Sequence, residues 1–428
     1  MVSPACDATR VAELSEPSTD RSPARVRVAW CRAWVSSAHR TFRGRSNRPP
    51  TSASVTSSRS TTVSTEGSGK RSVSWMSARV FSFLTVASSR SLLDSRSALE
   101  ENGQAVVLPA ANVRVEERRA EAFATMTWRP RQTLTVEAGA RVEASRLTQT
   151  GDSQLEKTFL YPKPRLLVTW ARDANHQLRF ELERRVGQLD FEDFVSSTSL
   201  TSNTITAGNP DLEPDKTWRL AATWERRFGK AGAIVLTVRH DQIFDAVDRV
   251  PIVGPGYAFD APGNIGDATR DEIELNASLP LDALILGGLL KADVTARRSR
   301  VVDPATGARR GLSDEPSLEG ALRFTQDLPA RRLRWGVDAI LAEEKMEYRF
   351  DEVRTDRVGA RWSAFVETRP APAWNLRLEI DNLTSGKVDR RREQYAGLRG
   401  AAPLKRIETR GLDHGAFAGV TLQRSFGG

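Results

Sequence analysis

Apolar and polar residues alternate along most of the chain after residue 100, as they do along β-strands whose two faces differ. Residues 134–144 place Leu, Val and Ala on one face and Thr, Glu and Arg on the other. The same pattern recurs at residues 178–183, 358–367 and 374–381. Each of these strands is therefore expected to have one hydrocarbon face and one charged face.

The periodic runs are long, at roughly nine to fourteen residues, whereas strands of soluble proteins average about five or six. A tilted strand needs about nine to eleven residues to cross a bilayer. A soluble antiparallel sheet with one wet face shows the same alternation, so it is the length that favours a membrane-spanning barrel. Aromatic residues near the ends of runs fit interfacial girdles: Trp128, Trp170, Trp218, Phe228 and Trp374.

Connections between the runs alternate between short turns and longer loops, the latter at residues 185–216, 245–267 and 384–409. Outer-membrane barrels have short periplasmic turns and long outer loops. We therefore predict an all-β, antiparallel transmembrane barrel region. About thirteen strands are expected, beginning near Ala120, Thr133, Phe159, Gln177, Thr217, Ala233, Ala268, Leu289, Ser317, Arg332, Asp356, Ala373 and Arg410. Because a closed antiparallel barrel needs an even number, the barrel is expected to be incomplete.

Residues 1–99 differ from residues 100–428, since they are rich in Ser and Arg and show no sustained period. We predict that they are disordered. No basic region followed by an apolar core marks a secretory signal. Eight of the nine net positive charges of the chain lie within the first hundred residues. A basic nucleic-acid-binding protein with a sheet domain therefore stays an alternative, although we do not expect nucleic acid as a partner.

Side chains for metal, redox or catalytic chemistry are sparse. The two cysteines lie in the first fifty residues and the four histidines are scattered, which excludes a zinc ribbon and a disulfide framework. No nucleophile, base and orienting group occur in a recognisable order, so no enzyme, cofactor or resident metal is expected. A membrane-barrel hydrolase stays a distant alternative. An anionic ligand could meet Arg390, Arg391 and Arg392 in the final outer loop. The acidic run at Asp190, Glu192 and Asp193 is expected to be a solvated loop.

A more specific signal lies at residues 208–217, GNPDLEPDKT, followed by the strand WRLAATWERRF. It resembles the GNPxLxPE segment of TonB-dependent receptors, where the motif ends an outer loop and introduces a descending strand. Residues 376–385 resemble the penultimate strand of that family, and GAFAGVTLQRSF resembles its last strand. The residues that carry the resemblance are Gly208, Asn209, Pro210, Leu212, Pro214, Asn382, Leu383 and Phe426. We expect them to be structural, since they are turn formers and packing residues.

The resemblance implies an outer-membrane receptor that takes up a scarce nutrient, such as an iron-siderophore or cobalamin, with energy delivered through TonB. Members of the family close a barrel of 22 strands around an N-terminal plug. Residues 1–90 show no counterpart of the plug or of the TonB-contact segment. We therefore expect a C-terminal fragment that is not competent for transport alone and has outer-membrane lipid as its neighbour. Residues 1–90 are hypothesised to be read in a wrong frame or from a misplaced start.

Overall fold

The computed structural model describes residues 25–28, 81–96, 99–101, 104–106, 112–199, 204–229, 231–254 and 257–425. These residues form β-strands joined by turns and two short 3-10 helices, η1 (Phe191–Phe194) and η2 (Pro329–Arg331). No helix in this part of the chain is long and apolar enough to cross a membrane. Most of residues 1–80, where the disordered segment and the basic arm were expected, lie outside the described residues.

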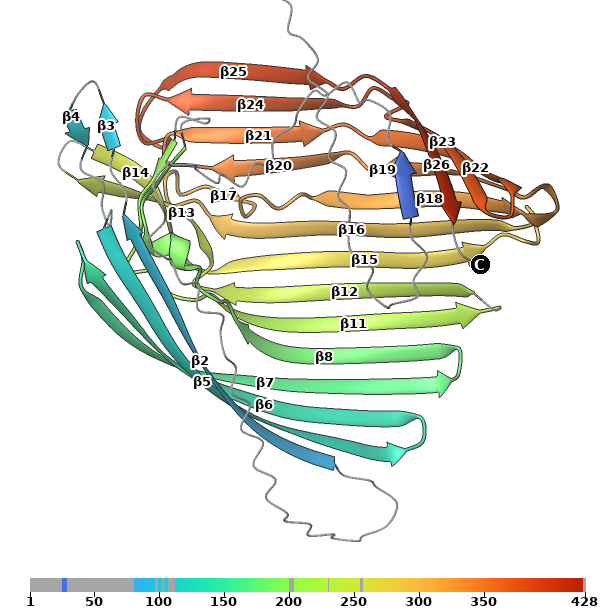
Figure 1. Cartoon of the computed structure of the whole chain (residues 1–428). Helices are drawn as coiled ribbons and strands as arrows, with labels where there is room; N and C mark the ends of the chain where they lie inside the picture. The colour runs from blue at the N-terminus through green and yellow to red at the C-terminus, as the bar shows by residue number, and fades with distance from the viewer. Residues whose placement is uncertain are drawn as a thin grey trace, which may run out of the picture.

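One large antiparallel sheet forms a curved wall (Figure 1). Neighbours in the wall follow the order β26-β23-β22-β19-β18-β16-β15-β12-β11-β8-β7-β6-β5-β2. Their bounds are β2 (Phe81–Arg96), β5 (Asn112–Arg131), β6 (Leu134–Gly151), β7 (Leu155–Asp173), β8 (His176–Val186), β11 (Lys216–Phe228), β12 (Gly232–Phe244), β15 (Ala268–Pro280), β16 (Gly288–Val302), β18 (Leu318–Leu328), β19 (Leu333–Ile340), β22 (Arg361–Ala371), β23 (Trp374–Asp381) and β26 (Phe417–Ser425).

The fold confirms the all-β antiparallel class. Nine of the thirteen expected starts lie within one residue of a strand start, and the other four lie inside strands: Ala120, Phe159, Asp356 and Arg410. The wall also contains β2, which the sequence pattern missed and which pairs with β5 along all of its 16 residues. The sheet therefore begins at Phe81, ahead of the expected boundary at residue 100. Ser and Arg residues make β2 look like the segment before it. With β2 the wall has fourteen strands, so the parity argument from thirteen no longer holds.

Short connections gather at one end of the wall, which we call the turn end, and longer ones at the other, the loop end (Figure 1). The connections at the loop end contain further strands. These are β9 (Ser197–Ser199), β10 (Thr204–Thr206), β13 (Val247–Gly254), β14 (Tyr257–Asn264), β17 (Arg309–Arg310), β20 (Glu343–Tyr348), β21 (Glu352–Val358), β24 (Lys387–Tyr395) and β25 (Leu404–Asp413); β3 (Leu99–Glu101) and β4 (Gln104–Val106) form a separate hairpin. Such strands carry charged residues on both faces, so they show no alternation of apolar and polar residues by which the sequence could reveal them.

Four wall strands break at neighbouring positions and continue as the separate sheet β20-β21-β24-β25. The breaks fall at residues 341–342, 359–360, 382–386 and 414–416. The last four expected strands, from Arg332 onward, are therefore each two strands in line, as β23 and β24 are in Figure 1. We call β20, β21, β24 and β25 the upper wall.

The two faces of the wall differ as the sequence predicts. On β7, Leu160, Leu166 and Trp170 are exposed on one face, and Tyr161 is buried on the other. The register places apolar residues of neighbouring strands beside them, as in the pair Trp170 and Leu178. The exposed apolar face is therefore continuous, and we call it the outward face. The opposite, charged face is the inward face.

The wall is open within the described residues. Its order is linear, and β2 at one end is not paired with β26 at the other. The short strand β1 (Arg25–Val28) pairs with the last four residues of β26 only. Along β2 and β25, one edge of backbone groups therefore has no strand partner in this part of the chain.

Candidate functional site: the inward face and the loop cap

Ion pairs between neighbouring strands cover the inward face. On β12, Asp241 has a side chain only 2% exposed and accepts bonds from Arg219 Nη2 at 2.7 Å and Arg270 Nη2 at 2.8 Å. On β6, Glu143 pairs with Lys163 and with Arg119, whose Nε lies 3.4 Å away. Opposite charges on adjacent strands stabilise a sheet locally. The face is therefore polar without presenting a large unbalanced field.

The inward face has a recess, a cavity of about 290 Å³ beside β16, β18, β19, β22 and β23. Its charged walls are balanced: four cations face four acids there, namely Lys291, Arg323, Arg361 and Arg377 with Asp293, Asp338, Glu379 and Asp381. Arg323 pairs with Asp338 at 2.7 Å, and the guanidinium of Arg377 stacks 3.9 Å from the ring centroid of Phe365. Such a recess suits a polar occupant of mixed charge rather than an apolar one.

The GNPDLEP motif lies at the loop end and folds back against the inward face. Leu212 is fully buried in an apolar cluster with Val113, Val115, Leu147 and Phe194. A Cβ on Gly208 would come within 2.4 Å of the carbonyl oxygen of Phe194, so this position requires glycine. The motif therefore fixes a close approach between its own loop and η1.

Asn209 and Asn264 tie the motif to the hairpin β13–β14. The side-chain amide of Asn209 donates to the carbonyl oxygen of Pro262 at 2.9 Å, and its Oδ1 accepts from the N–H of Asp211 at 3.0 Å. Asn264 accepts from the N–H of Glu213 at 2.9 Å and donates to the carbonyl oxygen of the same residue at 2.8 Å. These bonds satisfy backbone groups of the loop.

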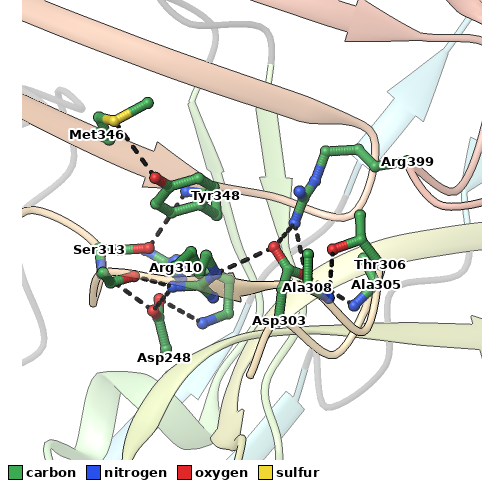
Figure 2. A network of polar contacts seen from close by, with 12 residues as sticks. Asp248, Asp303, Ala305, Thr306, Ala308, Arg310, Ser313, Met346, Tyr348 and Arg399 are labelled. Atoms are coloured by element: carbon green, nitrogen blue, oxygen red, sulfur yellow. Dashed lines mark hydrogen bonds and ion pairs between the residues drawn. The ribbon is translucent and has the colours of Figure 1, made fainter. Parts of the chain in front are cut away.

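A second assembly at the loop end joins connections that are distant in the sequence, and we call it the loop cap: residues 247–254, 257–264, 303–316, 346–352 and 396–403. At its centre Arg310 donates to Asp303 at 3.0 Å and to Asp248 at 2.7 Å (Figure 2). Arg399 holds both oxygens of Asp303, at 2.9 and 2.7 Å. The guanidinium of Arg310 also stacks 4.4 Å from the ring centroid of Tyr348.

These groups are buried, with side-chain exposures between 3% and 7% for Asp303, Arg310 and Arg399. Burial disfavours the ionised form of Asp303, but the bonds from Arg399 and from the N–H of Ala305 outweigh it and lower the pKa of the carboxyl. A second buried pair joins Arg349 of the β20–β21 turn to Asp260 of β14 at 2.8 Å. The cap is therefore a network of charges that depend on one another.

The sequence did not predict the cap, since its partners are separated by as many as 96 residues, as for Arg399 and Asp303. A local signal exists only at residues 303–307, DPATG, which is a turn sequence. There Gly307 has a positive φ of 72° and donates to the carbonyl oxygen of Asp303 at 2.8 Å.

The three arginines considered for an anionic ligand lie in strand β24, rather than in the final outer loop. Each has an acidic partner: Arg390 pairs with Asp356 at 2.6 Å, Arg391 with Glu393 at 2.7 Å and Arg392 with Glu352 at 2.7 Å. Successive side chains of a strand point to opposite faces. Arg391 is therefore separated from the other two.

Asn382 and Leu383 lie at the break between β23 and β24, where Asn382 adopts a φ of 56°. The buried amide of Asn382 donates to the carbonyl oxygen of His414, and its Oδ1 accepts from the N–H of Gly386 at 2.8 Å. The N–H of Leu383 donates to the carbonyl oxygen of Trp362 at 2.8 Å. The pair therefore links three broken strands. Phe426 lies outside the described residues.

The acidic run of the η1 loop shows no arrangement for a cation. Asp190 caps η1 by accepting from the N–H of Glu192 at 3.1 Å. Burial and the neighbouring Asp190 raise the pKa of Asp193. Within the described residues, no group of three or more His, Cys, Asp or Glu side chains could hold a metal ion.

The wall and its loops define a class of protein: a barrel wall with an apolar outward face, an ion-paired inward face and large loops at one end. The sequence model of the family described as TonB dependent receptor-like, beta-barrel, matches residues 25–383. The chain therefore belongs to this family, which confirms the resemblance found in the sequence. Its match also includes part of the segment before residue 100.

Solved structures show the same fold. The copper transporter OprC is similar with a TM-score of 0.57 and 14% identity, over 82% of this chain and 55% of the other. The ferric yersiniabactin uptake receptor FyuA from Yersinia pestis has a TM-score of 0.53 and 12% identity, over 82% and 52%. The ferric-catecholate import receptor Fiu from Escherichia coli K12 has a TM-score of 0.53 and 10% identity, with the same coverage as FyuA. The chain thus spans about half the length of these proteins. No curated relative matches the sequence.

Proposed function

We propose that this chain forms the C-terminal wall of an outer-membrane uptake receptor that passes a scarce nutrient, such as a metal-siderophore complex or cobalamin. The observation that carries the proposal is the two-faced wall, apolar outward and ion-paired inward, with loops folded over one end. Its family consists of receptors rather than enzymes, and the similar solved proteins are described as a copper transporter and ferric-siderophore receptors. The turn end would face the periplasm and the loop end the exterior.

We further propose that the wall is not transport-competent by itself. An open sheet edge within hydrocarbon leaves backbone groups without partners, at a cost of several kcal/mol for each group. The edge of β2, and that of β26 from Phe417 to Thr421, are open in this way among the described residues. Because β2 and β26 run in opposite directions, the strands that close the barrel must be even in number. Eight would complete the 22 strands that the family resemblance implies.

The two faces can be tested with neighbouring apolar residues of β7. Leu166 points outward and Leu167 inward. We would introduce Leu166→Cys and Leu167→Cys separately, with Cys6 and Cys31 replaced by Ser, label each with a fluorophore and reconstitute the chain in phosphatidylcholine vesicles. A lipid-embedded quencher should act on position 166, and a water-soluble quencher on position 167. Equal response of the two labels to both quenchers contradicts the proposed wall.

Transport can be tested by restoring the missing strands. Translation of the DNA upstream of the β2 codons in the other two frames should yield plug-like sequence and an export signal. The reconstructed gene should then support uptake of an iron-siderophore or of cobalamin in a receptor-deficient cell, whereas this chain alone should not. Uptake by the chain alone contradicts the proposal that it is incompetent. Absence of plug-like sequence in both frames contradicts the frame hypothesis.

The sequence also raised roles for the TonB system, for the motif residues and for the arginines of β24. The TonB system would act on the reconstructed receptor, since no TonB-contact segment is recognised in the sequence of the described wall. The GNPDLEP residues and the pair Asn382 and Leu383 are proposed to be structural, in line with the bonds described above. Because Arg390 and Arg392 are both engaged by carboxylates of β21, anion recognition by these arginines would require a ligand that competes with those carboxylates.

A further inference from the structure

The outward face of β16 changes from apolar to cationic between two successive outward residues, Ala296 and Arg298. Leu290, Ala292, Val294 and Ala296 occupy this face toward the turn end, and Arg298 and Arg300 continue the same row toward the loop end. Val302 follows, half exposed, and its partner across the ladder is Arg309 of β17. All three arginines are exposed. We call Arg298, Arg300 and Arg309 the outward arginine row; β16 and β17 can be followed in Figure 1.

Few acids balance this row. Within the described residues, Arg298 and Arg309 make no ion pair, and Arg300 lies 3.8 Å from Asp271, a carboxylate that also bonds His240 at 2.7 Å. The contrast with the inward face is direct. Arg297, the immediate neighbour of Arg298, points inward and holds Glu272 at 2.9 Å and Glu319 at 2.8 Å. The shortage of acidic partners is therefore a property of the row and not of arginines on this strand in general.

The chemistry of the row indicates its occupant. Alternate residues of a strand lie about 6.6 Å apart, so neighbouring guanidinium groups of the row can reach a single phosphate from two sides. Guanidinium forks match phosphate oxygens and are more weakly hydrated than ammonium groups. Ala296 and Val302 place hydrocarbon directly beside the charges. A ligand with both a phosphate and an apolar part therefore fits better than a free anion.

We propose that the outward arginine row binds the phosphate group of a membrane lipid in the leaflet that surrounds the loop end. The inference rests on the proposed function in one respect, the immersion of the outward face in lipid. It adds a specific site, in which the three guanidinium groups fix the height of β16 relative to the lipid phosphates. Each cation near an anionic membrane surface contributes favourably to such an attachment.

The experiment uses the full chain in detergent micelles with added lipid A, which carries phosphate groups, and with dephosphorylated lipid A. Lipid retained after size exclusion is counted by native mass spectrometry. The unaltered chain should retain lipid A at least tenfold more than the dephosphorylated form. The triple variant R298Q/R300Q/R309Q should lose this preference, and R298K/R300K/R309K should keep a part of it, because lysine preserves the charge but not the fork.

A matched control is available on the same face. Arg118 and Arg146 also point outward near the loop end, and they pair with Glu116 at 2.8 Å and Glu156 at 2.7 Å. R118Q/R146Q should therefore retain lipid A within about twofold of the unaltered chain. The inference is overturned if the triple Gln variant retains as much lipid A as the unaltered chain. It is also overturned if the control variant loses as much lipid A as the triple Gln variant. Complete displacement by millimolar inorganic phosphate would show a free-anion site and also overturns it. These outcomes do not depend on vesicle insertion, which tests the proposed function separately.

Discussion

The wall and the loop cap are stabilised in different ways. In the wall, consecutive strands pair over long continuous registers, as β5 and β6 do from Val113 to Arg131, and the apolar side chains face away from the protein. In the cap, buried side-chain charges join connections from distant parts of the sequence, as Arg399 and Asp303 show. Local alternation therefore determines the wall, whereas the cap depends on a few long-range pairs. Removing one side chain should affect the cap far more than the wall.

The largest expected effect is that of Asp303→Asn. Asparagine keeps the shape of the side chain but removes the charge that Arg310 and Arg399 share, so two buried guanidinium groups lose their common anion. Breaking a buried pair in this way costs about 3–5 kcal/mol. Hydrogen exchange of residues 303–316 and 346–352 should accelerate accordingly.

The matched control for this change is Asp338→Asn in the wall. Its partner Arg323 is 60% exposed, so the loss should stay below about 1 kcal/mol. Unchanged exchange in the cap of the Asp303→Asn variant would contradict a network of dependent charges. A uniform increase over wall and cap would show that the two regions do not differ in the way described here.

A somewhat smaller effect is expected for Leu212→Ala in the GNPDLEP motif. Leu212 is fully buried between the motif loop and the inward face of β5 and β6, and truncation of such a residue costs about 2–5 kcal/mol. Limited proteolysis should cut within residues 187–216 at a higher rate. Leu220→Ala on the outward face of β11, where the side chain is 57% exposed, should leave that rate unchanged. Equal rates for Leu212→Ala and the unaltered chain would contradict an anchoring role.

The sequence was informative where the two faces of a strand differ. Strand positions and the two-faced wall followed from alternation, and the motif at residues 208–214 indicated a structural loop. Alternation failed for β2, which is rich in Ser and Arg, and for β24, which carries the run Arg390, Arg391 and Arg392 where a loop was expected. Beyond the bilayer both faces of a strand can be polar, so the period of two leaves no contrast to detect.

The partners of a charged residue could not be predicted either. Arg310 and Arg391 look alike in the sequence, yet Arg310 is buried between two aspartates from separate connections and Arg391 is exposed beside Glu393 of its own strand. Only the arrangement of the loops decides which arginine is buried. For the same reason, the sequence alone singled out the exposed arginine run of β24 and missed the outward arginine row.

The junction between wall and upper wall should respond to Asn382→Ala. This change removes the bonds to His414 and Gly386 and places alanine at a φ of 56°, at an expected cost of about 1–3 kcal/mol. Asn382→Gly loses the same bonds but tolerates the backbone conformation. If the bonds matter most, both variants should raise hydrogen exchange at residues 382–388 similarly. A normal rate in the Gly variant alone would assign the role of Asn382 to its backbone conformation.

The smallest effect is expected from mild acidification, which should separate the cap from the wall without any substitution. Bonds from arginine lower the folded-state pKa of Asp303 and of Glu352 against the opposing effect of burial. A carboxyl with a depressed folded pKa contributes stability above its unfolded pKa, about 4, and loses that contribution as the pH falls through the folded value. Between pH 7 and pH 5 neither of these two carboxyls should therefore loosen the cap relative to the wall. Below about pH 4 hydrogen exchange should rise at residues 303–316 first, because backbone strand pairing still holds the wall when the ion pairs of its inward face are lost. A cap that loosens already at pH 6 would mean that groups other than these two carboxyls hold it.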